Sequence, residues 1–361
     1  MANTTHTQGW TPDPDGRGTI SLLWSCLFTL FICTWIAVHP EVGDSKLGMK
    51  FLFMFMGLMA PEIWSMNAIW EIFEARELLK RMRKLGYKHW TLQHSFFADM
   101  GGFKLQVGEQ TQLQNLTNDA TKLWWMVKEG HVPVPEISKD ELMDRSKEDS
   151  LAKAIAVLQA GWLLVQCIAR AVQGLPITTL ELTTMAFVFC TTISYAAWWK
   201  KPKDVQYPII IKISALRPEI TSSLDKVPGG LLVSGSQRDN FEIIAMSVVG
   251  TLFGCFHCIA WNWHFPTAME CLLWRVAAVM STVALPIALP MFIFSIVRFF
   301  SCDGFRDSSK SMICQVMFHI VTLFYLLARV YLIVEVFISL RALPSDVYKS
   351  VEWVNFLPNI S

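Results

Sequence analysis

Several ionisable side chains lie inside, or at the ends of, long apolar stretches of this chain. The set contains acids, bases and one histidine: Arg170, Glu181, His257, Glu270, Arg275, Arg329 and Glu335. An ionisable group at the centre of a bilayer costs at least about 2.5–3.5 kcal/mol on insertion scales, so such groups usually face a bundle interior and carry function. A carboxylic acid in an apolar setting tends to keep its proton, and it can then act as a proton donor.

These residues need helices to position them, and seven apolar stretches are candidates. The stretches are 20–38, 47–70, 152–173, 177–199, 242–263, 271–299 and 313–340. Each reaches or approaches the ~20 residues that a helix needs to cross about 30 Å of hydrocarbon. Hydrophobic residues make up 53% of the chain and charged residues only 17%, below the roughly 25% of soluble domains. We expect an all-α integral membrane bundle of about seven transmembrane helices, or eight with a re-entrant segment.

Polar segments divide the expected bundle into parts. We expect a lead-in at 1–19, helices at 20–70, a loop with amphipathic helices at 71–151, helices at 152–199, a loop at 200–241, helices at 242–340 and a tail at 341–361. The apolar segment Trp90–Phe103 is too short to span a membrane, so a re-entrant or interfacial position is expected. The loop 203–240 contains an isoleucine run and a Gly-Gly pair, which suggests a small hairpin.

Lysine and arginine are concentrated on one side of this arrangement. The loops 71–151, 200–241 and 300–312 hold most of them, and the positive-inside rule places these loops in the cytosol. With seven spans, the lead-in lies on the same side as these loops and the tail lies opposite, in a lumen. The first apolar run acts as a signal anchor in this interpretation. We expect the endoplasmic reticulum membrane as the location.

The ionisable residues allow a structural interpretation as well as a functional one. Arg170 with Glu181, and Glu270 with Arg275, could form interfacial ion pairs across short turns. His257 could equally bond a carbonyl of its own helix. Arg329 and Glu335 are flanked by Leu, Val, Ile and Phe, which favours a buried polar pocket. A second group is expected in the cytosolic half, with Glu62 the deepest of Glu62, Asn67, Glu71, Glu74, His94 and Asp99.

Aromatic side chains share the apolar stretches with the acids. They include Trp24, Trp35, Trp64, Trp261 and Trp274. An aromatic face stabilises a cation by roughly 0.5–2 kcal/mol, and cyclisation of an isoprenoid requires both an acid and aromatic walls. No Asp-Asp-x-x-Asp motif, Walker loop or His-Glu-x-x-His motif occurs, so neither a metal nor a cofactor is expected. The net charge of +1 and the absence of a basic stacking pattern argue against nucleic acid.

Four segments resemble a family of multi-pass fungal membrane proteins. The matching residues are WTPDPDGRGT (10–19) with WSC, QCIARAVQGLPIT (166–178) with LE and WWKKP, HCIAW (257–261) with FP, E and LWR, and YLLARVYLIVEVFISLRALP (325–344). Together they cover most of the expected spans. The set is similar to the transmembrane terpene cyclases of fungal meroterpenoid pathways, which open a terminal epoxide on a farnesylated aromatic. The resemblance implies an enzyme of secondary metabolism with the ionisable residues inside its shared motifs.

The residues and the resemblance together lead to a functional hypothesis: acid-triggered cyclisation of a lipophilic isoprenoid without a cofactor. Glu335 or Glu181 is the expected proton donor, Arg329 and Arg170 orient it, and His257 takes the final proton. The expected substrate-binding residues are Trp261, Glu270, Arg275, Tyr325 and Glu62.

The expected partners are the isoprenoid and the lipid bilayer. One alternative is a transporter or channel whose Arg/Glu/His site binds an ion or solute midway through the bundle. A seven-span receptor is a third possibility, supported by the number of spans alone.

Overall fold

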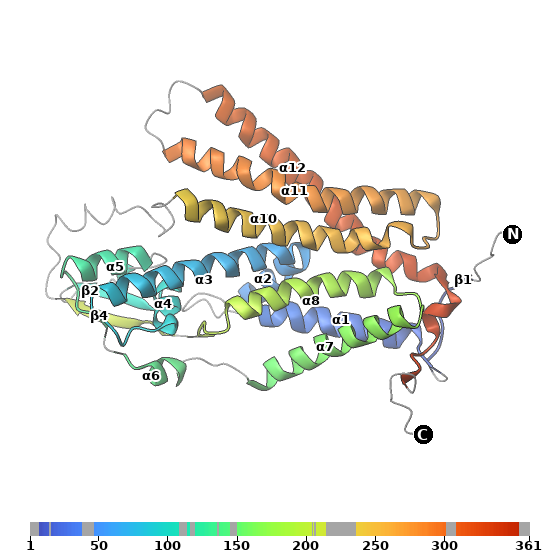
Figure 1. Ribbon diagram of the computed structural model, residues 1–361, viewed down its shortest axis with the longest axis horizontal. Helices are drawn as coiled ribbons and strands as arrows, with labels where there is room; N and C mark the ends of the chain where they lie inside the picture. Colours follow the sequence, from blue (N-terminus) through green and yellow to red (C-terminus); the bar gives the residue numbers. More distant parts are fainter. Residues whose placement is uncertain are drawn as a thin grey trace.

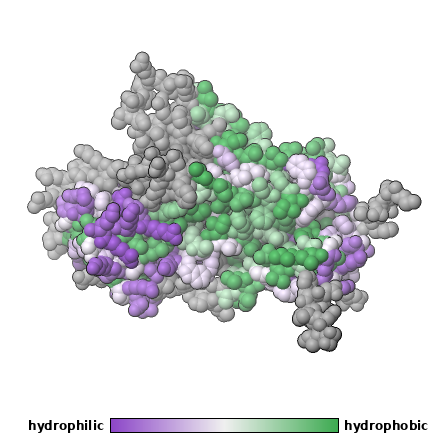
Figure 2. All heavy atoms as spheres, viewed as in Figure 1, coloured by the Kyte–Doolittle hydropathy of each residue, from purple (hydrophilic) through white to green (hydrophobic). Residues whose placement is uncertain are grey.

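The protein is mostly helical, and its long helices lie side by side in a bundle (Figure 1). The computed structural model describes residues 7–13, 16–37, 47–107, 114–115, 120–135, 137–144, 150–203, 205, 207–213, 236–300 and 308–353. A small mixed domain lies at one end of the bundle and both chain termini lie at the other. Figure 2 shows hydrophobic side chains over the bundle and hydrophilic ones over the small domain, as expected for a bundle embedded in lipid.

The bundle consists of long helices separated by short turns or polar loops. They are α1 (Thr19–Ala37), α2 (Leu47–Met59), α3 (Pro61–Lys84), α7 (Ser150–Val172), α8 (Thr179–Ala197), α10 (Ser236–Cys258), α11 (Ala268–Phe300) and α12 (Ser308–Ile338). Four segments are long and apolar enough to cross a membrane, namely Ala154–Val172, Thr179–Ala197, Ala268–Ala288 and Met312–Ala342. Thr19–Trp35 and Ser247–Asn262 are apolar but shorter. The protein therefore has the helices of an integral membrane protein, while seven full spans are not seen among the described residues.

The helices α2 and α3 form a bent pair inside the bundle. They meet at an angle of 108°, directly before Pro61, which cannot donate a helical hydrogen bond. Phe51 near the start of α2 contacts Trp35 at the end of α1, and Glu71 further along α3 bonds Trp198 just after α8. Both arms thus point to one end of the bundle. The expectation of a single helix over 47–70 is wrong, because the chain breaks into two helices directly before Pro61.

The lead-in and the tail meet at the other end of the bundle. Strand β1 (Thr7–Gln8) pairs antiparallel with β5 (Leu343–Pro344), which follows the 3₁₀ turn η3 (Ser339–Ala342). The turn η4 (Ser345–Tyr348) comes next, and the hydroxyl of Tyr348 donates to the carbonyl of Gly9 at 2.6 Å. The expectation that these two segments lie on opposite sides is therefore wrong. Because β1 and β5 pair at the same end of the bundle, a chain that spans a membrane must cross it an even number of times between these two strands.

The segment Trp90–Phe103 lies in the core of the small domain and not in a re-entrant loop. The domain contains α4 (Leu92–Asp99), β2 (Phe103–Val107), β3 (Gln114–Asn115), α5 (Ala120–Lys128), α6 (Lys139–Asp144) and β4 (Ile209–Ile213). Trp90, Phe97 and Phe103 are buried there against α3 and α5. Their apolar character is met by protein neighbours instead of lipid.

The described part of loop 203–240 adds a strand to the small domain. Strand β4 runs parallel to β2, in the sheet order β3-β2-β4, so the isoleucine run does not form the hairpin that we expected from the sequence. Residues 214–235, with the Gly-Gly pair, lie outside the described part of the chain. The protein is thus mostly helical, as the all-α prediction expects, and its small domain adds one short sheet.

His94 stabilises the start of α4 through its neutral ring. Its Nδ1 accepts a hydrogen bond from the backbone N–H of Thr91 at 3.2 Å, and its Nε2 donates to the carbonyl of Ile137 at 2.9 Å. A capping arrangement of this kind satisfies N–H groups that a helix start leaves free. Burial lowers the pKa of His94 below its ordinary value, because the charged ring would lose its hydration.

We expect the small domain to lose stability as the pH falls below about 6.5, the ordinary pKa of histidine. The unfolded chain then binds a proton that His94 resists in the folded state, whereas above this pH the stabilisation is complete. Hydrogen exchange of peptides covering 90–107 should therefore speed up between about pH 7.5 and about pH 5.5. His94→Gln should weaken this dependence. An equal dependence in both proteins would contradict the role of His94.

Candidate functional site

The intramembrane ionisable groups separate into three clusters instead of one polar belt. The terminal cluster contains Arg17, Arg170, Thr178 and Glu181; the hairpin cluster contains Glu62, His257, Tyr325 and Arg329; the Glu270 cluster contains Glu270, Tyr331, Glu335 and Arg341. Glu181, Glu335 and His257, which the functional hypothesis combined, lie in different clusters. Each cluster is described in turn.

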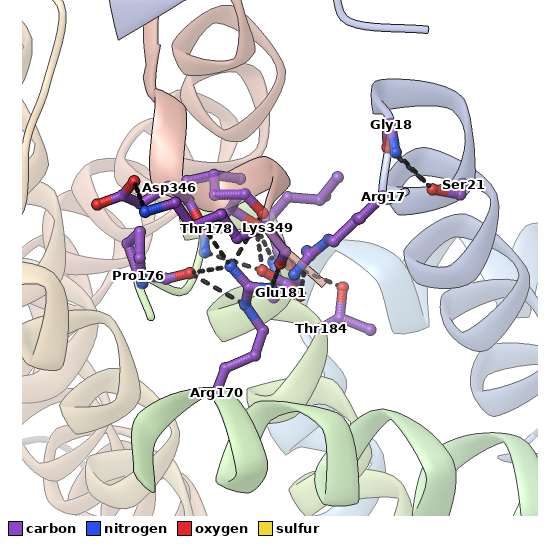
Figure 3. A network of polar contacts seen from close by, with 12 residues as sticks. Arg17, Gly18, Ser21, Arg170, Pro176, Thr178, Glu181, Thr184, Asp346 and Lys349 are labelled. Carbon is purple, nitrogen blue, oxygen red and sulfur yellow. Dashed lines mark hydrogen bonds and ion pairs between the residues drawn. The ribbon is translucent and has the colours of Figure 1, made fainter. Parts of the chain in front are cut away.

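Arg170 in the terminal cluster binds backbone carbonyls and not Glu181. Its side chain is 1% exposed and donates to the carbonyls of Pro176, Asp346, Val347 and Lys349 at distances between 2.8 and 3.3 Å. Figure 3 shows its guanidinium among these groups. The expected Arg170–Glu181 pair is wrong, and Arg170 instead fixes the tail to the end of α7.

Glu181 is both the helix cap of α8 and the ion-pair partner of Arg17. Its Oε2 accepts from the backbone N–H and the hydroxyl of Thr178, both at 2.9 Å, and its Oε1 pairs with Arg17 (Figure 3). The Thr-x-x-Glu spacing forms a capping box, a local pattern readable from the sequence. Every one of these neighbours donates a hydrogen bond to Glu181. Sequence reasoning did not assign Arg17 to the site, although it is the single lysine or arginine of residues 1–19.

A cavity of about 590 Å³ lies beside the terminal cluster. Its aromatic walls are Trp24 and Phe28 of α1, Trp162 of α7 and Trp353 of the tail, and Trp162 stacks on Trp353 with ring centres 5.3 Å apart. Arg17, Arg170 and Glu181 line its charged end, and the polar side chains of Ser21, Ser25, Gln159, Gln166 and Ser350 also border it. The volume is within the ~300–1,000 Å³ typical of sites for drug-sized molecules.

The hairpin cluster surrounds the bend between α2 and α3. Arg329 of α12 is fully buried, and its Nε donates to the carbonyl of Met59, the last residue of α2, at 2.9 Å. Its guanidinium carbon lies 4.5 Å from the ring centre of Phe253 and 5.7 Å from that of Phe187. Arg329 is therefore bonded to Met59 and not to Glu335, the acid that we had expected it to orient.

Glu62, Tyr325 and His257 complete the hairpin cluster. Glu62 is fully buried in the first turn of α3 and accepts a hydrogen bond from the hydroxyl of Tyr325. His257 is also fully buried, and its Nδ1 lies 3.1 Å from the carbonyl of Phe253. Within the described ranges, Glu62 Oε2, His257 Nε2 and both terminal nitrogens of Arg329 have no hydrogen-bond partner. The bend thus unites Glu62, which we had expected in a separate cytosolic group, with residues of α10 and α12.

In the Glu270 cluster, Glu335 contacts a tyrosine and not an arginine. The side chain is 2% exposed, and its Oε2 accepts from the hydroxyl of Tyr331 at 3.2 Å. Glu270 forms an ion pair with Arg341 at 2.5 Å. The cluster lies where α11 begins and α12 ends, so it joins these two helices.

Arg275 does not pair with Glu270, contrary to the prediction. Its Nε donates to the carbonyl of Trp261 at 2.9 Å, and its guanidinium carbon lies 5.3 Å from the centre of the Trp261 ring. Both residues therefore fix the turn between α10 and α11 and line no common site with Glu62 or Tyr325.

The other residues of the expected cytosolic group lie in two different parts of the protein, the bundle and the small domain. Asn67 donates to Glu71 at 2.8 Å, and Glu71 also accepts from Trp198 at 2.7 Å and from Lys201 at 2.5 Å. These bonds join α3 to the end of α8, while His94 belongs to the small domain. In the part of the chain described, no three His, Cys, Asp or Glu side chains are placed to hold a metal ion.

The chain was compared with known families, proteins and structures. A family model described as "Family of unknown function (DUF8562)" matches residues 1–223 and 232–360. No curated protein and no solved structure matches the chain. The functional argument therefore depends on the geometry of the cavity and of the clusters.

Proposed function

The chain belongs to the DUF8562 family, and we propose that it is a membrane-embedded enzyme that cyclises a lipophilic isoprenoid in the cavity of the terminal cluster. The observation that supports this best is the union of aromatic walls and a charged end in one cavity. The walls suit an isoprenoid chain and a carbocation formed on it. The charged end suits the polar group at which the reaction starts.

Glu181 supplies the proton in this proposal, and Arg17 controls when it does so. The polar end of the substrate displaces Arg17, and Glu181, left without its countercharge beside aromatic rings, takes up a proton. The acid then protonates the epoxide oxygen, the carbon–oxygen bond breaks, and alkene carbons attack the cation to form rings. Loss of a proton from carbon to the carboxylate of Glu181 ends the reaction and restores the acid, so the product is an isomer of the substrate. Arg170 has a structural part, because it holds the tail that carries Trp353.

We expect microsomes from a fungal host to convert a farnesylated phenol epoxide into a cyclic product of unchanged mass. Glu181→Gln should lower the rate by a factor of about 10²–10⁴, the usual contribution of a general acid. Trp162→Ala should lower it by up to about 30-fold, the loss of one cation–aromatic contact. Product formation is followed by mass spectrometry, with the unoxidised parent compound as the substrate control.

Two variants serve as matched controls for this experiment. Glu335→Gln alters a buried acid outside the cavity, and Trp199→Ala alters a tryptophan that is 62% exposed. Both should retain turnover within about threefold. If the wild-type protein is inserted in the membrane and turns over neither compound, or if Glu181→Gln matches wild type, the proposal is wrong.

A transporter or channel is the second candidate, and the hairpin cluster favours it. Broken helices at the middle of a membrane often carry the solute site of transporters. The α2–α3 bend places unpartnered polar atoms of Glu62 and Arg329 at such a break. A carrier needs access from both faces, so single cysteines on both sides of the bend would react with aqueous reagents. In a cyclase, one end of the cavity is closed to water, so cysteines at that end would not react with the aqueous reagents.

The orientation of the protein follows from the paired termini and from the basic loops. We propose six crossings, by α1, α7, α8, α10, α11 and α12, with α2–α3 as a re-entrant pair. The positive-inside rule then places the small domain in the cytosol and both terminal segments in the lumen of the endoplasmic reticulum. The cavity is therefore at the lumenal end of the bundle.

A further inference from the structure

The bend between α2 and α3 leaves hydrogen-bonding groups unused inside the bundle. Glu62, His257 and Arg329 are each 0% exposed, and each has a polar atom without a partner among the described residues. Arg329 interacts electrostatically with both Glu62 and His257, so the three groups are neighbours. Buried polar groups almost always have a hydrogen-bond partner, which is often an ordered water. Three such groups in one place indicate a ligand between them.

The roles of the three groups follow from the bonds that they already make. His257 Nδ1 lies beside the carbonyl of Phe253, which can only accept, so this nitrogen carries the proton and Nε2 offers a lone pair. Glu62 Oε2 is a second acceptor. Arg329 uses its Nε on Met59, and its two terminal nitrogens remain as donors. The site thus offers donors from Arg329 and acceptors from Glu62 and from the ring of His257.

We propose that the hairpin cluster binds a small uncharged hydroxyl group, which belongs to water or to a lipophilic alcohol. A hydroxyl oxygen accepts from the guanidinium of Arg329, and its hydrogen donates to Glu62 or His257. A bare anion has no hydrogen to donate to Glu62 or His257, and a bare cation is repelled by Arg329. The rings of Phe253 and Phe187 lie against the guanidinium, so the surroundings of the bound hydroxyl group are apolar.

This site is independent of the proposed cyclase cavity. The cavity is lined by α1, α7, Glu181 and the terminal segments, and none of Glu62, His257, Tyr325 and Arg329 borders it. Failure of one proposal therefore leaves the other standing. The sites also respond to different substitutions, which allows them to be tested separately.

The test uses the full-length protein in lipid nanodiscs and infrared spectroscopy in D2O. A water confined in the cluster should give a sharp O–D stretching band that is lost in His257→Phe and shifted in Glu62→Gln. The control Glu335→Gln, which alters a buried acid of another cluster, should leave the band unchanged. His257→Phe keeps an aromatic ring at this position and removes the acceptor nitrogen, so folding should persist.

Adding an alcohol distinguishes the two sources of the hydroxyl group. Farnesol is titrated into the nanodiscs and compared with its methyl ether, which has the same chain but no hydrogen to donate. Loss of the band with farnesol alone identifies an alcohol site, and a band that persists with both identifies a water site. The proposal is overturned if wild type shows neither a cluster-dependent band nor farnesol-specific binding. It is equally overturned if the band is the same in His257→Phe, Glu62→Gln and wild type.

Discussion

Replacing Arg170 with methionine is expected to release the tail from the bundle and to lower the free energy of unfolding by about 3–5 kcal/mol. The buried guanidinium donates to four backbone carbonyls, three of them in the tail at Asp346, Val347 and Lys349. Hydrogen bonds to a charged group contribute about 1.5–3 kcal/mol each, and part of this loss is recovered when water reaches the freed carbonyls. Denaturant unfolding in nanodiscs and limited proteolysis of the tail measure the effect.

Gln173→Ala is the matched control for Arg170→Met. Gln173 lies on the same helix end and bonds the backbone of Glu352 in the same tail, at 2.9 and 3.1 Å, but in an exposed position. Removing the Gln173 side chain should lower the free energy of unfolding by less than about 1 kcal/mol and leave the tail resistant to protease. If the two variants behave alike, the tail is held by its other contacts and Arg170 is not its anchor. Cyclisation should fall with Arg170→Met as well, because the tail carries a wall of the cavity.

Arg329→Met is expected to destabilise the protein by about 3–5 kcal/mol, the cost of leaving a buried charge without its countercharge. Glu62 would lose the only cation of its cluster, and the carbonyl of Met59 would lose its donor. Glu62→Gln should be destabilising in the same way, because it leaves Arg329 alone. The loss in free energy of unfolding of the double variant should be smaller, by about 1–3 kcal/mol, than the sum of the losses of the two single variants. Unfolding of all four proteins in nanodiscs gives this coupling.

Strict additivity of the two substitutions would show that Glu62 and Arg329 act independently, and the hairpin cluster would then not be one unit. A useful comparison is Arg275→Met, which alters an arginine bound to Trp261 at a turn. Its guanidinium is near no buried acid in the described structure, so a smaller loss, about 1 kcal/mol, is expected.

The helices of the bundle were predictable from apolar runs, whereas the partners of the charged residues were not. The runs 271–299 and 313–340 correspond closely to α11 and α12. The pairing of Arg170 with Glu181 seemed natural because one short turn joins their helices. Each residue instead bonds to a terminal segment, Glu181 to Arg17, 164 residues away, and Arg170 to Lys349, 179 residues away. No local pattern specifies contacts of such separation.

Two other differences between the prediction and the structure could have been anticipated from the sequence. Pro61 lies in the middle of an apolar run, and a proline there ends a helix more often than it continues one. Trp90–Phe103 is apolar, but apolarity alone does not separate a segment buried in lipid from one buried in protein. Charged neighbours on α3, such as Arg81 and Glu77, which bond each other at 3.0 Å, mark the polar face of a helix in water.

The pairing of β1 with β5 has a consequence for how the protein is made. Tyr348 bonds Gly9, and the two residues are 339 positions apart in the chain. The lead-in leaves the ribosome early, whereas Ser350 and Trp353, which complete the cavity, leave it after all the bundle helices. During synthesis, the face of α1 that borders the cavity therefore lacks its contacts with the tail until the last residues are made. The cavity can form only when the distant tail arrives, so incompletely synthesised chains lack the cavity however many of their helices are inserted.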